Sequence, residues 1–209
     1  MNKIFVTGIG TGIGKTFISA LLARALEADY WKPIQAGIDE GTDSEYVQRT
    51  LTGTPGLVHP EAYKLRMPAS PHIAAREEGI SISIPKICGQ VPSISRNLII
   101  EGAGGLMVPL NETEFVADLI KALEAKVILI SRNYLGSINH SLLTARVCRE
   151  MNIPVIGWIF NDQYLHYEEE IVRWTQYPLI ASVPYMKAED GQFIEAQTAA
   201  LQKRLKGFL

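Results

Sequence analysis

A glycine-rich segment near the start of the chain has the residue types that bind phosphate. It runs from Gly8 to Thr16 and reads GIGTGIGKT. Its glycines let backbone N–H groups turn toward an anion without Cβ clashes. Lys15 can reach the β- and γ-phosphates of a nucleoside triphosphate, and the Thr16 hydroxyl can bind Mg²⁺. The segment therefore indicates a phosphate-binding loop, one residue longer than the strict G-x-x-x-x-G-K-[ST] pattern when counted from Gly8 to Gly14.

Two other interpretations of this segment remain open from the residues alone. One is a glycine-rich turn between a strand and a helix that ends in Gly-Lys-Thr by accident. The other is a dinucleotide-binding turn, which Gly10 and Gly12 suggest. A lysine at the start of the helix would have no purpose in a dinucleotide turn. The preceding strand and following helix favour a loop for a nucleoside triphosphate.

Lys32 lies in an apolar segment directly before Pro33, which is an unusual place for a solvated charge. It is either a lysine that reaches the surface with its stem buried, or a second ammonium near the phosphates. Asp43 has two readings as well. Thr42 and Glu45 fit a capping box, so Asp43 either complements a helix dipole or provides a carboxylate for Mg²⁺.

Glu101 ends a buried strand and is followed by Gly102, Ala103 and Gly104. An acidic residue at this point is where phosphate-loop enzymes bind the metal or its waters, although a simple turn would also accept an acid. Further along the chain, the pair Gly136-Ser137 opens a helix and is either a second anion site, suited to a carboxylate, or only a helix cap.

Asn161 and Asp162 follow another apolar strand, where they either hydrogen-bond a base edge or form a polar turn. The chain has no Asn-Lys-x-Asp sequence, so guanine specificity has no support. His72 follows Ser70-Pro71 at the start of a predicted helix, which favours a local structural role.

Short apolar segments alternate with amphipathic ones along the chain, and this alternation predicts a mainly parallel sheet. The predicted strands are 3–7, 30–34, 97–100, 126–131, 154–160 and 179–183. The predicted helices are 16–28, 44–51, 71–78, 115–124, 138–151, 167–175 and 189–205. Residues 53–92 form the least regular part, interpreted as an excursion within one domain. The expected fold is a single α/β domain over residues 1–209, of the P-loop NTPase type, with helices on both faces of the sheet.

The composition excludes several classes of protein. The chain has 209 residues, a net charge of -2 and 47% hydrophobic residues, which predicts a folded domain without a strong field toward nucleic acid or an anionic membrane. Its two cysteines cannot form a disulfide framework or a four-thiolate zinc site. The apolar segments are too short to span a membrane. The chain begins with a predicted strand, which leaves no room for a signal peptide, so a cytoplasmic location is expected.

The motifs occur together and in the same order in dethiobiotin synthetases, which the sequence resembles from Val6 to about Pro184. The residues that carry the resemblance are the 8–16 loop, Trp31-Lys32-Pro33, Asp43, Ser70-Pro71-His72, Glu101 to Gly105, Gly136 to His140 and Asn161-Asp162. The resemblance implies an ATP- and Mg²⁺-dependent ligase of biotin biosynthesis. Such enzymes close a ureido ring on 7,8-diaminononanoate with CO₂ and are usually homodimers.

The resemblance also implies individual roles. It makes Lys32, Lys15 and Thr11 catalytic and places Thr16, Asp43 and Glu101 around Mg²⁺. The implied ATP-binding residues are Gly12, Ile13, Gly14, Lys15, Thr16, Phe17, Asp43, Glu101, Gly102, Ala103, Gly104, Asn161, Asp162, Pro184 and Glu189, with Asn161 facing adenine and Glu189 as the ribose-binding acid. The implied substrate-binding residues are Lys32, Ala36, Ser70, Gly136, Ser137 and Asn139, the last three holding the substrate carboxylate across a dimer interface.

The sequence departs from the family pattern at three positions. Family loops usually carry Asp where Gly10 stands and often an acid where Gly12 stands, so those carboxylates are absent here. A hydroxyl residue is common where Ala36 stands, so this chain has no hydroxyl to contact the substrate at that position.

Three other functions fit parts of the sequence less well than that of a dethiobiotin synthetase. A regulatory partitioning ATPase has an early lysine in its loop, which Ile9 and Gly10 do not provide. The ATP-using half of a cobyrinate-type amidase needs a glutaminase domain that 209 residues cannot hold. A non-catalytic phosphate-binding module would be separated by an ATP hydrolysis assay.

Overall fold

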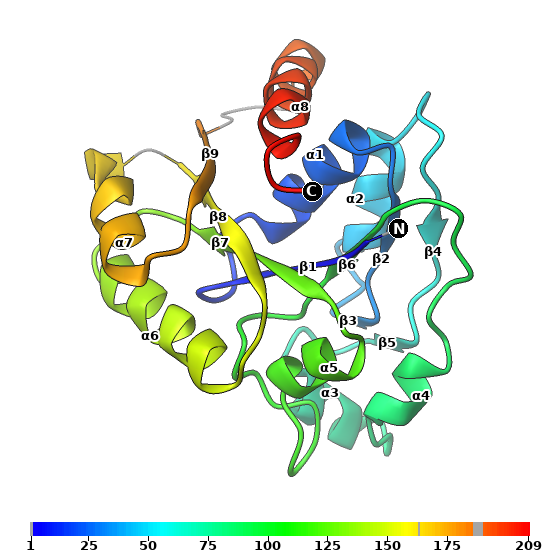
Figure 1. The fold of residues 1–209 in the computed structure, drawn as a ribbon. Helices are drawn as coiled ribbons and strands as arrows, with labels where there is room; N and C mark the ends of the chain where they lie inside the picture. The colour runs from blue at the N-terminus through cyan, green and yellow to red at the C-terminus, as the bar shows by residue number, and fades with distance from the viewer. Residues whose placement is uncertain (1, 163, 186–189) are drawn as a thin grey trace.

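The computed structural model describes residues 2–162, 164–185 and 190–209 (Figure 1). Within these residues, seven strands form one sheet in the order β4-β2-β6-β1-β7-β8-β9, and every adjacent pair is parallel. The strands are β1 Lys3–Gly8, β2 Asp29–Trp31, β4 Val58–His59, β6 Leu98–Glu101, β7 Lys126–Ser131, β8 Val155–Asn161 and β9 Leu179–Val183.

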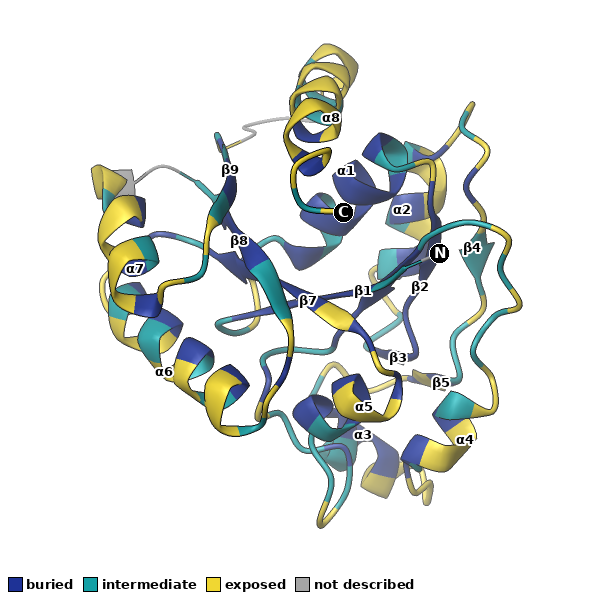
Figure 2. Ribbon diagram, viewed as in Figure 1, coloured by how far each residue is buried: buried dark blue, intermediate teal, exposed yellow. Residues whose placement is uncertain are grey.

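Helices cover both faces of this sheet, as the alternating pattern predicts (Figure 1). One layer, packed on a core with residues such as Ile4 and Ile99, consists of α1 Lys15–Ala25, α2 Asp43–Thr50 and α8 Gly191–Leu205. The other layer consists of α3 Pro71–Glu77, α4 Ile84–Cys88, α5 Val116–Ala122, α6 Ser137–Glu150 and α7 Glu168–Thr175. The central strands are buried on both sides (Figure 2), which explains their continuously apolar sequences.

The predicted strand 30–34 is wrong as a single strand, because the chain leaves the main sheet after Trp31. The next strand, β3 Ile34–Ala36, pairs in parallel with β5 Tyr63–Leu65 in a second, two-stranded sheet among the described residues. Pro33 has no N–H to donate to a strand ladder and restricts the residue before it, which accounts for the break. Lys32 therefore lies at the point where the chain passes from one sheet to the other.

The segment 53–92 has more regular structure than its sequence suggests. It holds the short strands β4 and β5 and the helices α3 and α4, of which only α3 was predicted. Elsewhere the predicted elements are present with ends shifted by a few residues. The first helix ends at Ala25 rather than 28, because Glu27 takes a left-handed conformation with φ of 48°. The start predicted for the last helix, at residue 189, lies outside the described residues.

In a parallel sheet of this kind, ligands bind beyond the carboxyl ends of the strands. The segments that follow β1, β2, β6, β7 and β8 hold many of the residues predicted to bind phosphate, metal or substrate. No helix in the described part of the chain is long and apolar enough to cross a membrane.

Candidate active site

The loop between β1 and α1 has a backbone that requires glycine at Gly14. Gly14 caps the helix with φ of 86°, and a Cβ added there would lie 1.9 Å from Asn161 Nδ2. Asn161 itself donates a hydrogen bond to the Ile13 carbonyl oxygen at 3.0 Å. In contrast, a Cβ added at Gly10 would meet no atom within 4 Å. The amide of Asn161 thus holds the loop from the end of β8, at the position where α1 begins.

Lys15 is buried, with 7% of its surface exposed, and its Nζ donates to the Gly10 carbonyl oxygen at 2.6 Å. The ammonium therefore lies over the loop that would surround a phosphate. Burial, together with the nearby Lys32, lowers the pKa of Lys15 to about 8, although Glu101 and Asp43 oppose the shift. A bound anion would supply the charge that this buried ammonium needs.

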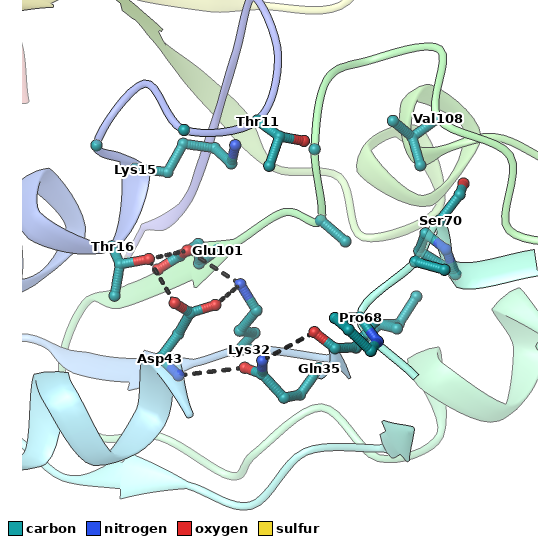
Figure 3. Close-up of a pocket in the computed structure, with 18 residues that line it drawn as sticks. Thr11, Lys15, Thr16, Lys32, Gln35, Asp43, Pro68, Ser70, Glu101 and Val108 are labelled. Carbon is teal, nitrogen blue, oxygen red and sulfur yellow. Dashed lines mark hydrogen bonds and ion pairs between the residues drawn. The ribbon is translucent and has the colours of Figure 1, made fainter. Parts of the chain in front are cut away.

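Four side chains from different elements meet beside this loop (Figure 3). Thr16 Oγ1 lies 2.7 Å from Asp43 Oδ1 and 2.8 Å from Glu101 Oε1. Lys32 Nζ donates to Glu101 Oε1 at 3.0 Å and forms an ion pair with Asp43. The cluster therefore joins α1, α2, β6 and the end of β2.

The charges in this cluster stabilise one another. Burial disfavours the charged form of Lys32, but Glu101 and Asp43 outweigh it and raise the pKa of Lys32 above its usual value. Burial likewise opposes the charge on Asp43, yet Lys32 and the Thr16 hydroxyl hold the pKa of Asp43 below its usual value. Lys32 is therefore an ammonium and Asp43 a carboxylate at neutral pH. Lys32 does not extend its ammonium to the surface, since only 5% of the residue is exposed.

Asp43 is the first residue of α2, which a capping box starts. Thr42 caps α2, its Oγ1 accepting from the Glu45 N–H, while the Glu45 carboxylate accepts from the Thr42 N–H at 2.8 Å. This capping box starts the helix at Asp43, whose carboxylate then faces Thr16 and Lys32. Local capping is thus the means by which the sequence places a carboxylate in the cluster.

Two residues of this neighbourhood were missed in the sequence. The Tyr30 hydroxyl donates to Glu101 Oε2 at 2.8 Å, and burial together with Glu101 raises the pKa of Tyr30 well above its usual value. Gln35 Oε1 accepts from the Asp43 N–H at 3.2 Å, and its Nε2 donates to the Gly37 carbonyl oxygen at 2.9 Å. The pairing of β2 with β6 was the signal that could have revealed Tyr30, but pairing is not visible in a single strand's sequence.

A cleft of about 750 Å³ opens above the cluster (Figure 3). It collects most of the residues predicted for phosphate, metal and substrate. The predicted residues that line it are Thr11, Gly12, Gly14, Lys15, Thr16, Lys32, Ala36, Asp43, Ser70, Glu101, Ala103 and Gly104. The fold therefore brings these residues, which are far apart in the sequence, together in one cleft. Pro71 and Val108 also line the cleft, and they give it an apolar side.

A second hollow of about 390 Å³ adjoins the first at Gly14, Thr16 and Asp43. Its other lining residues are Phe17, Tyr46, Asn161 and Tyr185, so it adds two predicted ATP-binding residues, Phe17 and Asn161, to those in the first cleft. A hollow with aromatic walls next to the phosphate loop suits a planar base.

Four other predicted ATP-binding residues that the structure describes do not line these two hollows: Ile13, Gly102, Asp162 and Pro184. Gly102 packs so closely on Phe5 that a Cβ there would lie 2.7 Å from Phe5 Cε1. Asp162 Oδ2 lies 3.3 Å from Arg132 Nε, in an ion pair. Pro184 directly follows β9, and Glu189 lies outside the described residues.

The predicted carboxylate site at the start of α6 lies outside both hollows. Gly136 takes φ of 102° before the helix, and Ser137 is fully buried, with its Oγ 2.7 Å from the Tyr167 hydroxyl. The Ser137 hydroxyl is therefore engaged inside the protein. A third hollow of about 390 Å³, mostly apolar, lies between α6 residues such as Leu143 and the loop at Met107.

The oxygens of the cluster fit a magnesium ion. Mg²⁺ is bound by one or two carboxylates together with substrate phosphates and water, rather than by a cage of protein ligands. Thr16, Asp43 and Glu101 supply a hydroxyl and two carboxylates beside the phosphate loop. No group of three or more His, Cys, Asp or Glu side chains that could hold a metal occurs in the described residues.

Comparison with known proteins agrees with this geometry. A family described as an AAA domain matches residues 2–192. The ATP-dependent dethiobiotin synthetase BioD of Cytophaga hutchinsonii is 50% identical over 88% of this chain and 88% of its own length. The BioD of Christiangramia forsetii is 43% identical over 98% of both chains. The chain belongs to the dethiobiotin synthetase family. The resemblance stated from the motifs is thereby confirmed.

More distant solved structures share the fold alone. The cell division ATPase MinD of Pyrococcus furiosus superposes with a TM-score of 0.62 at 13% identity, over 100% of both chains. A plasmid partition protein of Borrelia burgdorferi gives 0.62 at 11% identity, over 99% of this chain and 98% of its own. The predicted P-loop NTPase-type α/β fold is therefore confirmed.

Proposed function

We propose that this protein is an ATP-dependent dethiobiotin synthetase, which forms dethiobiotin from 7,8-diaminononanoate and CO₂ and releases ADP and phosphate. One observation supports this most strongly. In a chain of this family, a buried Lys32 ammonium is held by Glu101 and Asp43 beside a phosphate loop, within one cleft. A phosphate loop alone would serve binding or hydrolysis equally well.

ATP fits the two adjoining hollows as one ligand. Its phosphates would lie against the loop amides, with Lys15 released from Gly10 to reach them. Its base would occupy the hollow lined by Phe17 and Asn161, with Pro184 nearby. Glu189 remains our candidate for the ribose.

Thr16, Asp43 and Glu101 would hold Mg²⁺, and when bound the ion neutralises phosphate charge during transfer. The protein's own residues do the rest of the work. Asp43 and Glu101 keep Lys32 charged and fixed in the cleft. The Thr11 side chain lines the same cleft, and in this proposal its hydroxyl donates to the phosphoryl group during transfer.

The proposed reaction has three steps. One amine of the diamine captures CO₂ as a carbamate, which is a weak electrophile until its oxygen is phosphorylated. That oxygen attacks the γ-phosphate in line, and Lys15 and Lys32 stabilise the developing charge. The second amine then attacks the activated carbon, closes the ureido ring and expels phosphate. The positions of Ser70 and Ala36 in the cleft suit contacts to the diamine.

We further propose a homodimer in which Gly136 and Asn139 of one copy hold the substrate carboxylate of the other, while the buried Ser137 hydroxyl supports this turn through Tyr167. Leu135 is fully exposed, and Met107 and Leu143 are also exposed around the third hollow, so this face carries apolar surface that a second copy would cover. The partners are small molecules and a second copy, without nucleic acid or membrane. A cytoplasmic location completes the proposal.

Mass spectrometry of the reaction products tests the function. The purified protein is incubated with diaminononanoate, bicarbonate, Mg²⁺ and ATP, and dethiobiotin should form only when all four are present. ATP hydrolysis without dethiobiotin would instead point to an ATPase. If neither ADP nor dethiobiotin forms, an enzymatic role is rejected.

A further inference from the structure

Tyr30 is fully buried on β2, and its hydroxyl donates to Glu101 Oε2 at 2.8 Å. The other oxygen of the same carboxylate, Oε1, accepts from Thr16 Oγ1 at 2.8 Å and from Lys32 Nζ at 3.0 Å. Each oxygen of Glu101 therefore has its own donors. The donors to Oε1, Thr16 and Lys32, line the cleft, whereas Tyr30 is not among the described residues that line it.

The sheet register explains how Tyr30 reaches this carboxylate. Tyr30 is paired with Ile99 of the neighbouring parallel strand β6, and Glu101 lies two residues further along. Residues two apart on a strand point to the same face, so Tyr30 and Glu101 share one face of the sheet. The tyrosine ring spans the roughly 7 Å between these positions. The ring is part of a buried core cluster that also contains Ile99, the residue with which Tyr30 is paired.

We propose that Tyr30 is a positioning residue, whose hydroxyl fixes the Glu101 carboxylate so that Oε1 stays turned toward Thr16 and Lys32. The inference rests on the proposed function, because it assumes that Glu101 helps to hold the Mg²⁺ of the bound nucleotide. Without the hydroxyl, Oε2 would be buried without a donor. The carboxylate would then turn toward Lys32 with both oxygens and draw the ammonium away from Asp43.

Binding of Mn²⁺ in the presence of ADP tests this without relying on turnover. Tyr30→Phe removes the hydroxyl and keeps the ring. Titrations in which electron paramagnetic resonance measures free Mn²⁺ should give an apparent Kd for the metal in this variant that is about 10- to 100-fold higher than in the wild type. The affinity for ADP without metal should be unchanged. A Tyr30→Phe protein with wild-type Mn²⁺ affinity would overturn the proposal.

Tyr63→Phe provides a matched control. Tyr63 is also buried, and its hydroxyl accepts from the Ser83 N–H at 3.0 Å, away from the residues that line the cleft. This variant should bind Mn²⁺ with ADP as the wild type does. An equal loss in both variants would mean general damage to the core and would also overturn the proposal.

A double-mutant cycle with Glu101→Gln shows whether Tyr30 acts through Glu101. Adding Tyr30→Phe to Glu101→Gln should not weaken Mn²⁺ binding further, whereas additive losses would contradict a positioning role. The side-chain amide of the Glu101→Gln variant is neutral, so removing the Tyr30 hydroxyl from it leaves no buried charge without a donor. Glu101→Gln can therefore be compared with the double variant even if Tyr30→Phe alone does not fold. Failure of the wild type to make dethiobiotin would reject the proposed function but would leave these binding results intact.

Discussion

Lys32 keeps its charge in a buried position because two carboxylates flank it. Without Asp43 or without Glu101, the buried ammonium would have one neighbouring negative charge instead of two. Without Lys32, the two carboxylates would lose the cation that they share. A buried ion pair of this kind is weak evidence for stability, because desolvation opposes the Coulomb attraction. In the proposed mechanism, the ion pair keeps a rigid, charged donor at the place where phosphoryl charge develops.

Replacement of Lys32 tests that role. Lys32→Ala should lower kcat for dethiobiotin formation by about 10²- to 10³-fold, as loss of a transition-state donor does elsewhere. Lys64→Ala, at an exposed position of β5, is the control and should retain normal turnover. Near-normal turnover of Lys32→Ala, measured by mass spectrometry under saturating substrates, would reject the assignment.

The pKa of Lys15 predicts a proton uptake on nucleotide binding. Burial lowers this pKa to about 8 in the free protein, whereas bound phosphates raise it by favouring the ammonium. Above pH 8, Lys15 of the nucleotide-free protein is therefore mostly neutral, and it must take up a proton when the nucleotide binds. Calorimetry of ADP binding at pH 9 in buffers of different ionisation enthalpy should show uptake approaching one proton per site.

Lys15→Arg is the control for that measurement, because its guanidinium stays protonated at pH 9. This variant should bind ADP without the proton uptake. Equal uptake in the wild type and in Lys15→Arg would mean that another group titrates.

At the scale of elements, the carboxyl ends of the strands and the starts of two helices create the site. The β1 loop brings Lys15 and Thr16, the capping box of α2 brings Asp43, and β6 ends in Glu101. The amide of Asn161, at the end of β8, supports the loop through the Ile13 carbonyl oxygen.

Two glycines of the loop should respond oppositely to alanine. Gly14→Ala forces a side chain into a left-handed backbone and onto Asn161, so ADP affinity should fall by about tenfold or more. Gly10→Ala has free space around its Cβ and should bind ADP normally. Calorimetric Kd values for the two variants decide the matter, and equal affinities would show that the loop rearranges around Gly14.

Much of this arrangement was predictable from sequence, because its signals are local. The glycine loop, the capping box before Asp43 and the apolar strand before Glu101 each depend on a few adjacent residues. The break at Pro33 was missed because an apolar segment looks continuous even where the chain changes sheets. Tyr30 was missed for a different reason. Its role depends on the neighbouring strand β6, and strand pairing is set by the tertiary structure.

At the scale of the whole molecule, the two helical layers leave one apolar face uncovered around the third hollow. Leu143→Asp places a charge on this face and should convert a wild-type dimer into monomers in sedimentation velocity. It should also raise the KM for diaminononanoate, because the proposed carboxylate site is completed by the second copy. Leu57→Asp, also at an exposed leucine, is the control. A wild type that sediments as a monomer would contradict the dimer.

The transfer of an oxygen from CO₂ to phosphate tests the central claim most directly. If a carbamate oxygen attacks the γ-phosphate and the second amine later expels phosphate, that oxygen must leave with the phosphate. Brief turnover with ¹⁸O-labelled bicarbonate in unlabelled water, followed by mass spectrometry, should therefore yield phosphate with one ¹⁸O for each dethiobiotin formed. Dethiobiotin accompanied by unlabelled phosphate, under conditions where the bicarbonate keeps its label, would contradict the account.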